Sequence, residues 1–213
     1  MTSIHIVLGA PNNSALKPLM KNEGIVIGVD KGALIALNEG IKVDVALGDF
    51  DSISEDEMVE IKKHVPKVLG FPTDKDDTDT ELALLYVLDN YPTADVYLYN
   101  WYGGRIDHLY SILLLAIQKR FEKITANLYY VSEKNNISYF LPGQHTVQKV
   151  EGMDYLSYIS LTEVKDLILE NVKYPLESST FEQPIALISN EFIEEEAYFS
   201  FKEGIVAVVQ STD

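Results

Sequence analysis

The spacing of apolar residues changes about half way along the chain, and this change constrains the fold more than any other feature. In the first half, short apolar runs alternate with segments that have the 3.6-residue period of an amphipathic helix. The apolar runs cover residues 4–8, 25–29, 43–47, 67–69 and 96–99, and the helical segments cover residues 32–38, 56–64, 78–90 and 107–120. This alternation predicts an α/β fold with a doubly wound parallel sheet.

The second half lacks this helical period. After about Glu122 the chain consists of short runs rich in Tyr, Val, Ile and Ser, separated by turn residues such as Pro142, Gly143 and Gly152. Short strands at this spacing are typical of an all-β sandwich. We therefore expect an N-terminal α/β domain over residues 1–125 and a C-terminal β-sandwich domain over residues 126–213.

Charge and composition exclude several classes of partner. The formal net charge is −16, so the surface repels nucleic acids and anionic membranes. An acidic protein that handles phosphorylated molecules needs divalent cations to bridge carboxylates and phosphates. The chain has no cysteine, its first ten residues do not resemble a signal peptide, and no apolar run approaches the length of a membrane span. These features predict a cytoplasmic protein.

A pair of carboxylates follows one of the expected strands. The sequence Gly48-Asp49-Phe50-Asp51-Ser52 begins where the apolar run 43–47 ends. In an extended segment Asp49 and Asp51 would face the same side, and two carboxylates at a strand end can share Mg²⁺. Asp and Ser are also ordinary turn residues, so an Asx turn explains the pentapeptide equally well.

A second acidic segment precedes an expected helix. Residues 74–79 carry four aspartates in six positions, and Thr78 and Glu81 have the spacing of a capping box. One or two acids in a first helical turn are explained by the helix dipole. Four repel one another unless cations neutralise them, which favours a metal or substrate site in this segment.

Two loops combine glycines with polar residues at expected strand ends. Residues 103–108 read Gly-Gly-Arg-Ile-Asp-His, and residues 28–33 read Gly-Val-Asp-Lys-Gly-Ala. Glycines let backbone amides approach a phosphate, and Arg105 offers a planar fork for its oxygens. Asp30 can accept hydrogen bonds from a ribose or a base. Alternatively, the first loop is a flexible turn with a solvated arginine, and the second is a tightly packed helix start.

All four loops belong to the first half and follow expected strands. The carboxyl ends of parallel strands meet at one edge of a sheet, so an open α/β fold brings these loops to one crevice. No Walker signature, dinucleotide fingerprint, or Ser-His or Cys-His pair is evident. The combination of carboxylates, an arginine and glycine turns indicates metal-assisted phosphoryl chemistry.

The motifs resemble those of the bacterial thiamin pyrophosphokinase family, in the same order and spacing. The matching segments are GVDKGA at 28–33, LGDFDS at 47–52, FPTDKDDTD at 71–79 and GGRIDH at 103–108, with VKYPL at 172–176 and ISNEF at 188–192. The resemblance spans nearly the whole chain. It implies transfer of pyrophosphate from ATP to thiamin, an α/β domain that binds ATP and Mg²⁺, and a β-sandwich that completes the thiamin site in a homodimer.

The resemblance also implies a role for individual residues. Catalysis would fall to Asp49, Asp51, Asp79 and Arg105, metal binding to Asp49, Asp51, Asp76 and Asp79, ATP binding to Asp30, Lys31, Gly32, Gly48, Asp76, Thr78, Gly104 and Asp107, and thiamin binding to Ser189 and Asn190. Two residues depart from the family pattern: Asn171 and Leu187 stand where glycine is expected. Because glycine takes positive φ freely, the local backbone is in question at both.

Two other functions are compatible with parts of this pattern. A metal-dependent nucleotidyltransferase also uses paired aspartates on an α/β sheet, but it releases pyrophosphate instead of AMP. A non-catalytic sensor would bind thiamin or a nucleotide without turnover. Product analysis distinguishes the first alternative from a pyrophosphokinase, and binding without turnover would identify the second.

Overall fold

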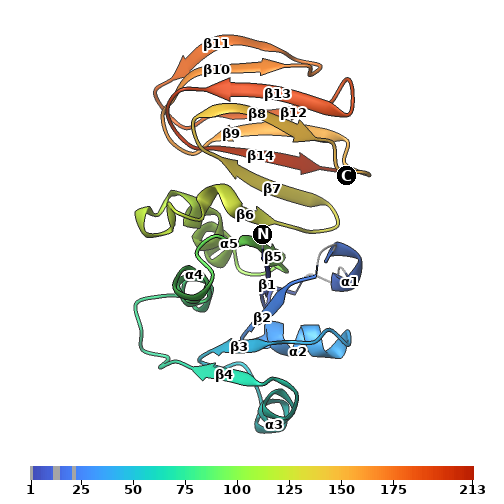
Figure 1. Cartoon of the computed structure of the whole chain (residues 1–213), viewed down its shortest axis with the longest axis vertical. Helices are drawn as coiled ribbons and strands as arrows, with labels where there is room; N and C mark the ends of the chain where they lie inside the picture. The colour runs from blue at the N-terminus through green and yellow to red at the C-terminus, as the bar shows by residue number, and fades with distance from the viewer. Residues whose placement is uncertain (1, 12–14, 21–22) are drawn as a thin grey trace. The chain divides into compact units, whose positions relative to one another are not determined.

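The chain forms two compact units in a computed structural model that describes residues 2–11, 15–20 and 23–213 (Figure 1). The first unit is Met1–Ser132 and the second is Glu133–Asp213. The division comes after the expected end of the first domain at residue 125. The reason is strand β6 (Leu128–Tyr130), which pairs in parallel with β5 and so belongs to the first sheet.

The first unit contains the parallel sheet that the sequence predicts. Its strands are β1 (Ser3–Val7), β2 (Ile25–Val29), β3 (Val45–Gly48), β4 (Lys67–Gly70), β5 (Asp95–Tyr99) and β6. Their order in the sheet is β6-β5-β1-β2-β3-β4, and every pairing is parallel. The strand order reverses between β1 and β5, and such a switch point is where open α/β sheets bind ligands.

Helices cover both faces of this sheet. They are α1 (Leu16–Leu19), α2 (Lys31–Asn38), α3 (Glu55–His64), α4 (Asp79–Asn90) and α5 (Ile106–Leu113), followed by the 3₁₀ turns η1 (Leu114–Ile117), η2 (Lys119–Phe121) and η3 (Thr125–Asn127). One buried cluster joins residues of α1, α2 and α3 to strands β1, β2 and β3. In Figure 1, α4 lies on the opposite side of these strands from α2. This is the doubly wound arrangement.

Two helices begin with capping boxes of the same design. At α4, the Thr78 hydroxyl accepts from the backbone N–H of Glu81, while the Glu81 carboxylate accepts from the backbone N–H of Thr78. Ser54 and Glu57 make the same reciprocal pair at α3. Each box satisfies two amides that a helix start leaves without partners. The capping box predicted at residue 78 is therefore confirmed.

The second unit is a sandwich of two antiparallel sheets. Its strands are β7 (Asn135–Phe140), β8 (Gly143–Gln148), β9 (Tyr155–Ser160), β10 (Val164–Glu170), β11 (Leu176–Phe181), β12 (Ala186–Asn190), β13 (Glu196–Phe201) and β14 (Val206–Ser211). One sheet has the order β12-β9-β14-β7 and the other β11-β10-β13-β8. Buried residues of both sheets, among them Tyr158 and Phe199, form a single apolar core. The predicted fold class is confirmed.

Sequence and structure differ at a few elements. The helix expected over residues 107–120 ends at Leu113 and continues as 3₁₀ turns. Helix α1 and strand β6 are too short to show a period, so no pattern predicted them. Among the residues that the structure describes, no helix is long and apolar enough to cross a membrane.

Candidate functional site

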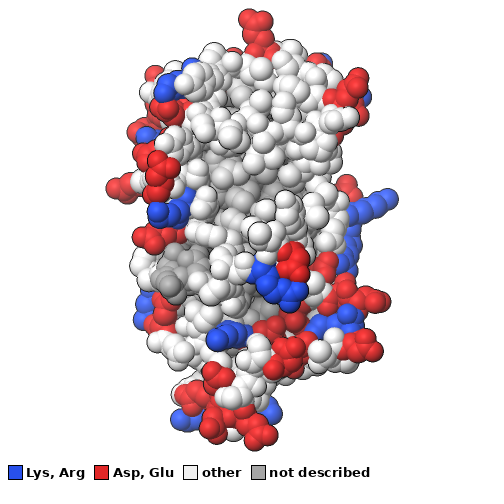
Figure 2. Space-filling model, turned by 180° about the vertical axis from the view of Figure 1, so that it is seen from behind, with Lys and Arg blue, Asp and Glu red and all other residues white. Residues whose placement is uncertain are grey.

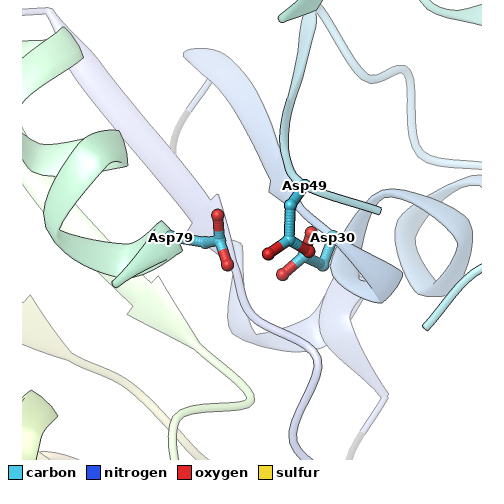
Figure 3. A group of neighbouring side chains, drawn as sticks. All are labelled: Asp30, Asp49 and Asp79. Carbon is cyan, nitrogen blue, oxygen red and sulfur yellow. The ribbon is translucent and has the colours of Figure 1, made fainter. Parts of the chain in front are cut away.

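Three aspartates from separate parts of the first unit meet at the carboxyl edge of the parallel sheet. Asp30 follows β2, Asp49 follows β3, and Asp79 is the first residue of α4. Their side chains offer carboxylate oxygens that all lie within 4.8 Å of one another (Figure 3). We call this group the aspartate triad. The loops that were predicted to converge on one edge of the sheet therefore bring three carboxylates together, and carboxylate oxygens are ligands for hard divalent cations.

The backbone around the triad is shaped to hold Asp30 beneath the loop that follows β3. The Asp30 carboxylate accepts from the backbone N–H of Phe50 at 3.1 Å. Gly48 has φ +150°, and a Cβ at this glycine would lie 1.9 Å from Asp30 Oδ1, so no larger residue fits. Asp30 and Phe50 themselves have φ values of 47° and 56°. Non-glycine residues take such angles at a cost, and they cluster at functional sites.

Burial and like charges act on the Asp30 carboxyl. Burial raises the pKa of Asp30 to about 7, and the neighbouring charges of Asp79 and Asp49 act in the same direction. The hydrogen bond from the Phe50 amide opposes this shift. A carboxyl group in this state strongly favours a nearby cation, since a cation removes the repulsion between the three charges.

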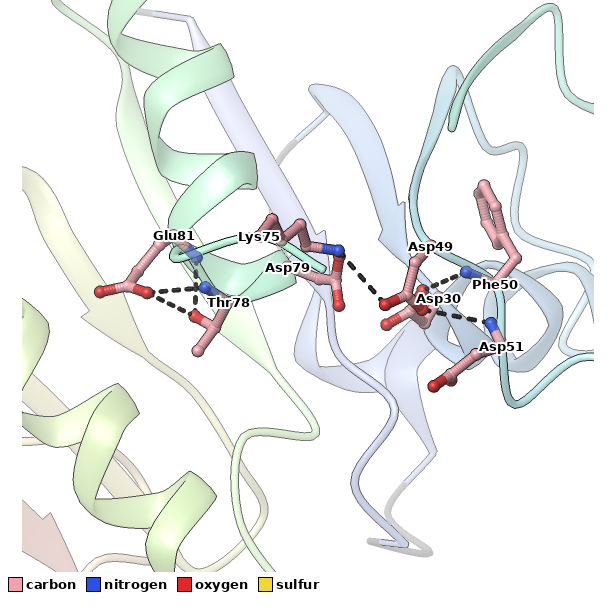
Figure 4. A network of polar contacts seen from close by, with 8 residues as sticks. All are labelled: Asp30, Asp49, Phe50, Asp51, Lys75, Thr78, Asp79 and Glu81. Carbon is pink, nitrogen blue, oxygen red and sulfur yellow. Dashed lines mark hydrogen bonds and ion pairs between the residues drawn. The ribbon is translucent and has the colours of Figure 1, made fainter. Parts of the chain in front are cut away.

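A lysine supplies part of the positive charge that the triad lacks. Lys75 Nζ lies 2.6 Å from Asp79 Oδ1 and 3.3 Å from Asp49 Oδ2 (Figure 4). Burial disfavours the charged form of Lys75, but the hydrogen bonds and charges of Asp79 and Asp49 outweigh it and raise its pKa. Lys75 lies within the matching segment 71–79, but no role was predicted for it.

Two aspartates predicted as metal ligands lie outside the triad. Asp51 is exposed, and its backbone N–H donates to Asp49 Oδ1 at 3.2 Å. That bond is an Asx turn, which was one of the two alternatives for this pentapeptide. Asp76 is also exposed. Its neighbour Asp77 is paired at 2.5 Å with Arg120, away from the triad.

The glycine loop after β5 presents an exposed ion pair. Arg105 Nη2 lies 2.5 Å from Asp107 Oδ2, and Arg105 Nε donates to Asp107 Oδ1 at 3.1 Å. The hydrogen bond from Arg105 lowers the pKa of Asp107 to about 2. A Cβ at Gly104 would lie 3.2 Å from the Pro11 ring, so this loop lies against the segment that follows β1. These two segments flank the switch point of the sheet.

The glycines of the loop after β2 serve close packing. A Cβ at Gly32 would lie 2.0 Å from the carbonyl oxygen of Val7, and one at Gly28 would lie 2.3 Å from Ala33 Cα. Helix α2 therefore begins in direct contact with the sheet, as the packing alternative for this loop predicts. Lys31 is exposed beside these glycines. Thr78 uses its hydroxyl to cap α4.

Comparison with known proteins agrees with this geometry. The model of the thiamin pyrophosphokinase catalytic domain matches residues 16–136, and that of the thiamin pyrophosphokinase vitamin B1 binding domain matches residues 144–206. A thiamine pyrophosphokinase of Bacillus subtilis is 36% identical over 217 residues, which covers 100% of both chains. The chain belongs to the thiamin pyrophosphokinase family.

Solved structures of the family have the same fold. A thiamin pyrophosphokinase family protein from Enterococcus faecalis is 35% identical with a TM-score of 0.93, and the thiamine pyrophosphokinase of Bacillus subtilis is 33% identical with a TM-score of 0.85. Each comparison covers 100% of both chains. Membership of the thiamin pyrophosphokinase family favours that activity over the nucleotidyltransferase and the sensor.

The second matched region contains the residues that the family resemblance assigns to thiamin. Asn190 is buried at the end of β12. Its side-chain oxygen accepts from the backbone N–H of Tyr174, and its side-chain nitrogen donates to the carbonyl of Tyr174. Asn190 therefore links the segments 188–192 and 172–176. Ser189 is exposed and has φ 59°. Its backbone N–H donates to Ser157 Oγ at 3.1 Å.

The two departures from the family pattern have different structural outcomes. Asn171 takes φ 57°, the conformation for which glycine was expected, and asparagine tolerates it better than most residues. Its amide nitrogen also donates to the carbonyl of Glu196 at 2.6 Å. Leu187 instead lies within strand β12, where it pairs with Tyr158. The pairing of β12 with β9 shifts register between Leu187 and Asn190, in the segment that contains Ser189 with its positive φ.

Proposed function

We propose that this chain transfers the pyrophosphate group of ATP to the hydroxyl of thiamin, which yields thiamin pyrophosphate and AMP. The observation that carries this proposal is the aspartate triad, Asp30, Asp49 and Asp79, at the carboxyl edge of the sheet in a chain of this family. A partly buried group of carboxylates at this edge suits a metal-assisted reaction of phosphates better than acyl transfer.

The donor set of the triad fits Mg²⁺. All of its ligand atoms are carboxylate oxygens, which are the ligands that hard divalent cations prefer. Lys75 pairs with Asp49 and Asp79, so the triad retains an excess of negative charge, and a divalent cation would neutralise it. Asp49 and Asp79 would hold the ion, with Asp30 beside them. Asp51 and Asp76, which lie on the adjoining loops, would complete the site or orient the reacting groups.

The residues of the chain would act mainly by positioning and by moving one proton. Mg²⁺, when bound, neutralises charge on the phosphate oxygens. The thiamin hydroxyl attacks the β-phosphorus in line, and the bond to the oxygen that AMP keeps is broken. A carboxylate, Asp79 or Asp51, takes the hydroxyl proton. Asp79 lies inside the triad and is fixed by the start of α4, which favours it as the proton acceptor.

The nucleotide would be held by the loops that surround the triad. Arg105 would exchange part of its exposed pairing with Asp107 for phosphate oxygens, since a guanidinium binds phosphate in two-point fashion. The backbone of Gly104 leaves room for close approach. The other residues assigned to ATP on the family pattern are Asp30, Lys31, Gly32, Gly48, Asp76 and Thr78.

Thiamin would bind in a homodimer at the exposed Ser189, while Asn190 fixes the loop that carries Tyr174.

Support for self-association comes from helix α5 and the turn after it. Ile106, Tyr110 and Leu114 are 69%, 63% and 46% exposed and recur every four residues on one side. Sedimentation equilibrium would test the dimer, because a monomeric mass at micromolar concentration would contradict it.

The reaction is tested directly by its products. The purified chain is incubated with ATP, Mg²⁺ and thiamin, and all phosphorylated products are resolved by chromatography beside a metal-free control. Equal amounts of AMP and thiamin pyrophosphate that depend on Mg²⁺ are expected. Release of inorganic pyrophosphate would instead indicate a nucleotidyltransferase, and intact ATP with bound thiamin would indicate a sensor.

A further inference from the structure

Lys75 is inserted between two of the acids that would hold a metal ion. Its ammonium group contacts Asp79 Oδ1 at 2.6 Å and Asp49 Oδ2 at 3.3 Å. The side chains of all three residues are largely buried, with exposed fractions of 14% for Lys75, 11% for Asp49 and 19% for Asp79. Among the residues that the structure describes, Lys75 is the only cation that forms an ion pair with the triad.

The placement of this lysine needs an explanation beyond packing. Burying an ammonium group is costly unless anions offset the loss of water. Asp49 and Asp79 provide that compensation, and in return Lys75 reduces the repulsion between them. Asp79 is fixed as the first residue of α4 by the capping box of Thr78 and Glu81. Lys75 comes from the loop before the helix, so its long side chain can leave without any change in the helix.

We propose that Lys75 is an internal counterion that takes the place of a divalent cation in the free protein and leaves Asp49 and Asp79 when that cation binds. The inference rests on the metal site proposed above. It assigns Lys75 a positioning role, because the lysine acts on the arrangement of the carboxylates. Lys75 keeps them close together while no metal is present.

The ammonium group and a divalent cation cannot share these oxygens. Mg²⁺ binds carboxylate oxygens at about 2.0–2.1 Å in near-octahedral geometry, so its centre would lie within a few ångströms of Lys75 Nζ. Two cations at that distance in a partly buried site repel each other strongly. Removal of the lysine charge should therefore strengthen metal binding and weaken the metal-free fold. A residue that only packs would not produce these opposite effects.

The decisive experiment is a titration of the free protein with Mn²⁺, followed by electron paramagnetic resonance, without nucleotide. Lys75→Met removes the charge but keeps an unbranched side chain, and Lys75→Arg keeps the charge. Lys42→Met is the matched control, since Lys42 is 81% exposed and pairs with Asp44 at 2.7 Å. We expect Lys75→Met to bind Mn²⁺ on the order of tenfold more tightly than the wild type. Lys42→Met and Lys75→Arg should stay close to the wild type.

Thermal unfolding provides the second readout. In EDTA, Lys75→Met should unfold about 3 °C below the wild type, and saturating Mn²⁺ should remove or reverse this difference. Equal Mn²⁺ affinity of the wild type and Lys75→Met would overturn the role of Lys75 while leaving the metal site intact. Reduced turnover of Lys75→Met with unchanged Mn²⁺ affinity would also overturn it, because it would assign the lysine to the substrate.

A failure of the metal site itself gives a different result. If neither the wild type nor Lys75→Met binds Mn²⁺, with or without ATP, the result contradicts both the proposed metal site and the role of Lys75. Asp49→Asn tests the same point independently, because it should abolish the tight Mn²⁺ site in the Lys75→Met background. The product assay shows separately whether the chain transfers pyrophosphate.

Discussion

The two sides of the N-terminus of α4 carry similar residues in opposite states of charge balance. On one side, Asp79 meets Asp30 and Asp49 with a single lysine between them. On the other, Arg120 contacts Asp77 and Glu81 at 2.5 Å each. Gln118 donates a further hydrogen bond to Glu81, and the Thr78 backbone donates another.

The consequences for the acids differ accordingly. Burial would raise the pKa of Glu81, but the hydrogen bonds from Thr78 and Gln118 and the charge of Arg120 outweigh it and lower the pKa. At Asp30 burial and like charges prevail, and the pKa rises. Acids whose charge is compensated by hydrogen bonds and cations stabilise the fold. Acids whose pKa is raised by burial and like charges are candidates for a binding site. The same stretch of sequence therefore contributes to two acidic clusters, one whose charge is compensated and one with an excess of negative charge.

The largest expected effect comes from neutralising an acid of the triad. Asp49→Asn or Asp79→Asn should lower turnover at saturating Mg²⁺ by a factor on the order of 10² to 10³, because each removes a charge that would hold the proposed metal ion. Glu81→Gln, on the balanced side, is the control. Initial rates of AMP and thiamin pyrophosphate formation, corrected for the folded fraction, measure both. Near-normal rates in the two triad variants would contradict the assignment.

The triad should also give the metal-free protein an unusual dependence on pH. The pKa of Asp30 is about 7 in the folded chain, above the value of 3.8 for an unperturbed carboxyl. Between these values the folded state holds a proton that the unfolded state has lost, so the free energy of unfolding falls as pH rises from about 4 to 7. Below about pH 4 the Asp30 carboxyl is protonated in both the folded and the unfolded state, so it no longer lowers the free energy of unfolding.

Asp30→Asn should remove this loss of stability. We expect the variant to exceed the wild type by on the order of 1–3 kcal/mol at pH 7.5 in EDTA, with a much smaller difference at pH 4.5. Urea unfolding at a series of pH values measures the difference, and Mg²⁺ should reduce it. A difference that does not vary with pH would show that the Asp30 charge is already compensated.

Much of the fold and part of the triad could be predicted from sequence. The alternation of apolar runs and helical segments gave the parallel sheet, since burial on both faces leaves a strong pattern. Topology then implied that Asp30 and Asp49, at the ends of neighbouring strands, lie close together. Short elements such as α1 carry no usable period.

The choice among the acids of residues 74–79 could not be made from the sequence. Periodicity places Asp79 at a helix start, but the direction of each side chain in the loop depends on tertiary contacts. Asp77 turns toward Arg120, which is 43 residues distant in the chain, and no local pattern reports such a pairing. The role of Lys75 also depends on tertiary contacts. In the sequence, a lysine among aspartates has the composition of an ordinary surface segment.

Acidic composition alone is a poor guide to such sites. Helix α3 carries Glu55, Asp56 and Glu57 in its first turn, and Figure 2 shows acidic side chains gathered over this part of the first unit. These acids face solvent and complement the helix dipole. The triad differs because its carboxylates come from separate elements and are partly buried.

Loss of Arg120 should affect stability more than catalysis. Arg120→Met leaves Asp77 and Glu81 without their shared cation, and it should lower the free energy of unfolding by about 1–2 kcal/mol. Turnover per folded molecule should stay within a few fold of the wild type. Urea unfolding and initial rates on the same preparation test both statements. A rate loss as large as that of Asp79→Asn would place Arg120 with the residues of the triad.

The smallest effects should come from the two capping boxes. Ser54→Ala at α3 and Thr78→Ala at α4 remove the same hydroxyl acceptor, so each should cost about 1 kcal/mol of stability. Only Thr78 precedes a residue of the triad. Thr78→Ala should therefore also lower turnover, by loosening the position of Asp79, whereas Ser54→Ala should not. Equal turnover in the two variants would mean that contacts of Asp79 with Lys75 suffice to position it, and that the start of α4 contributes stability alone.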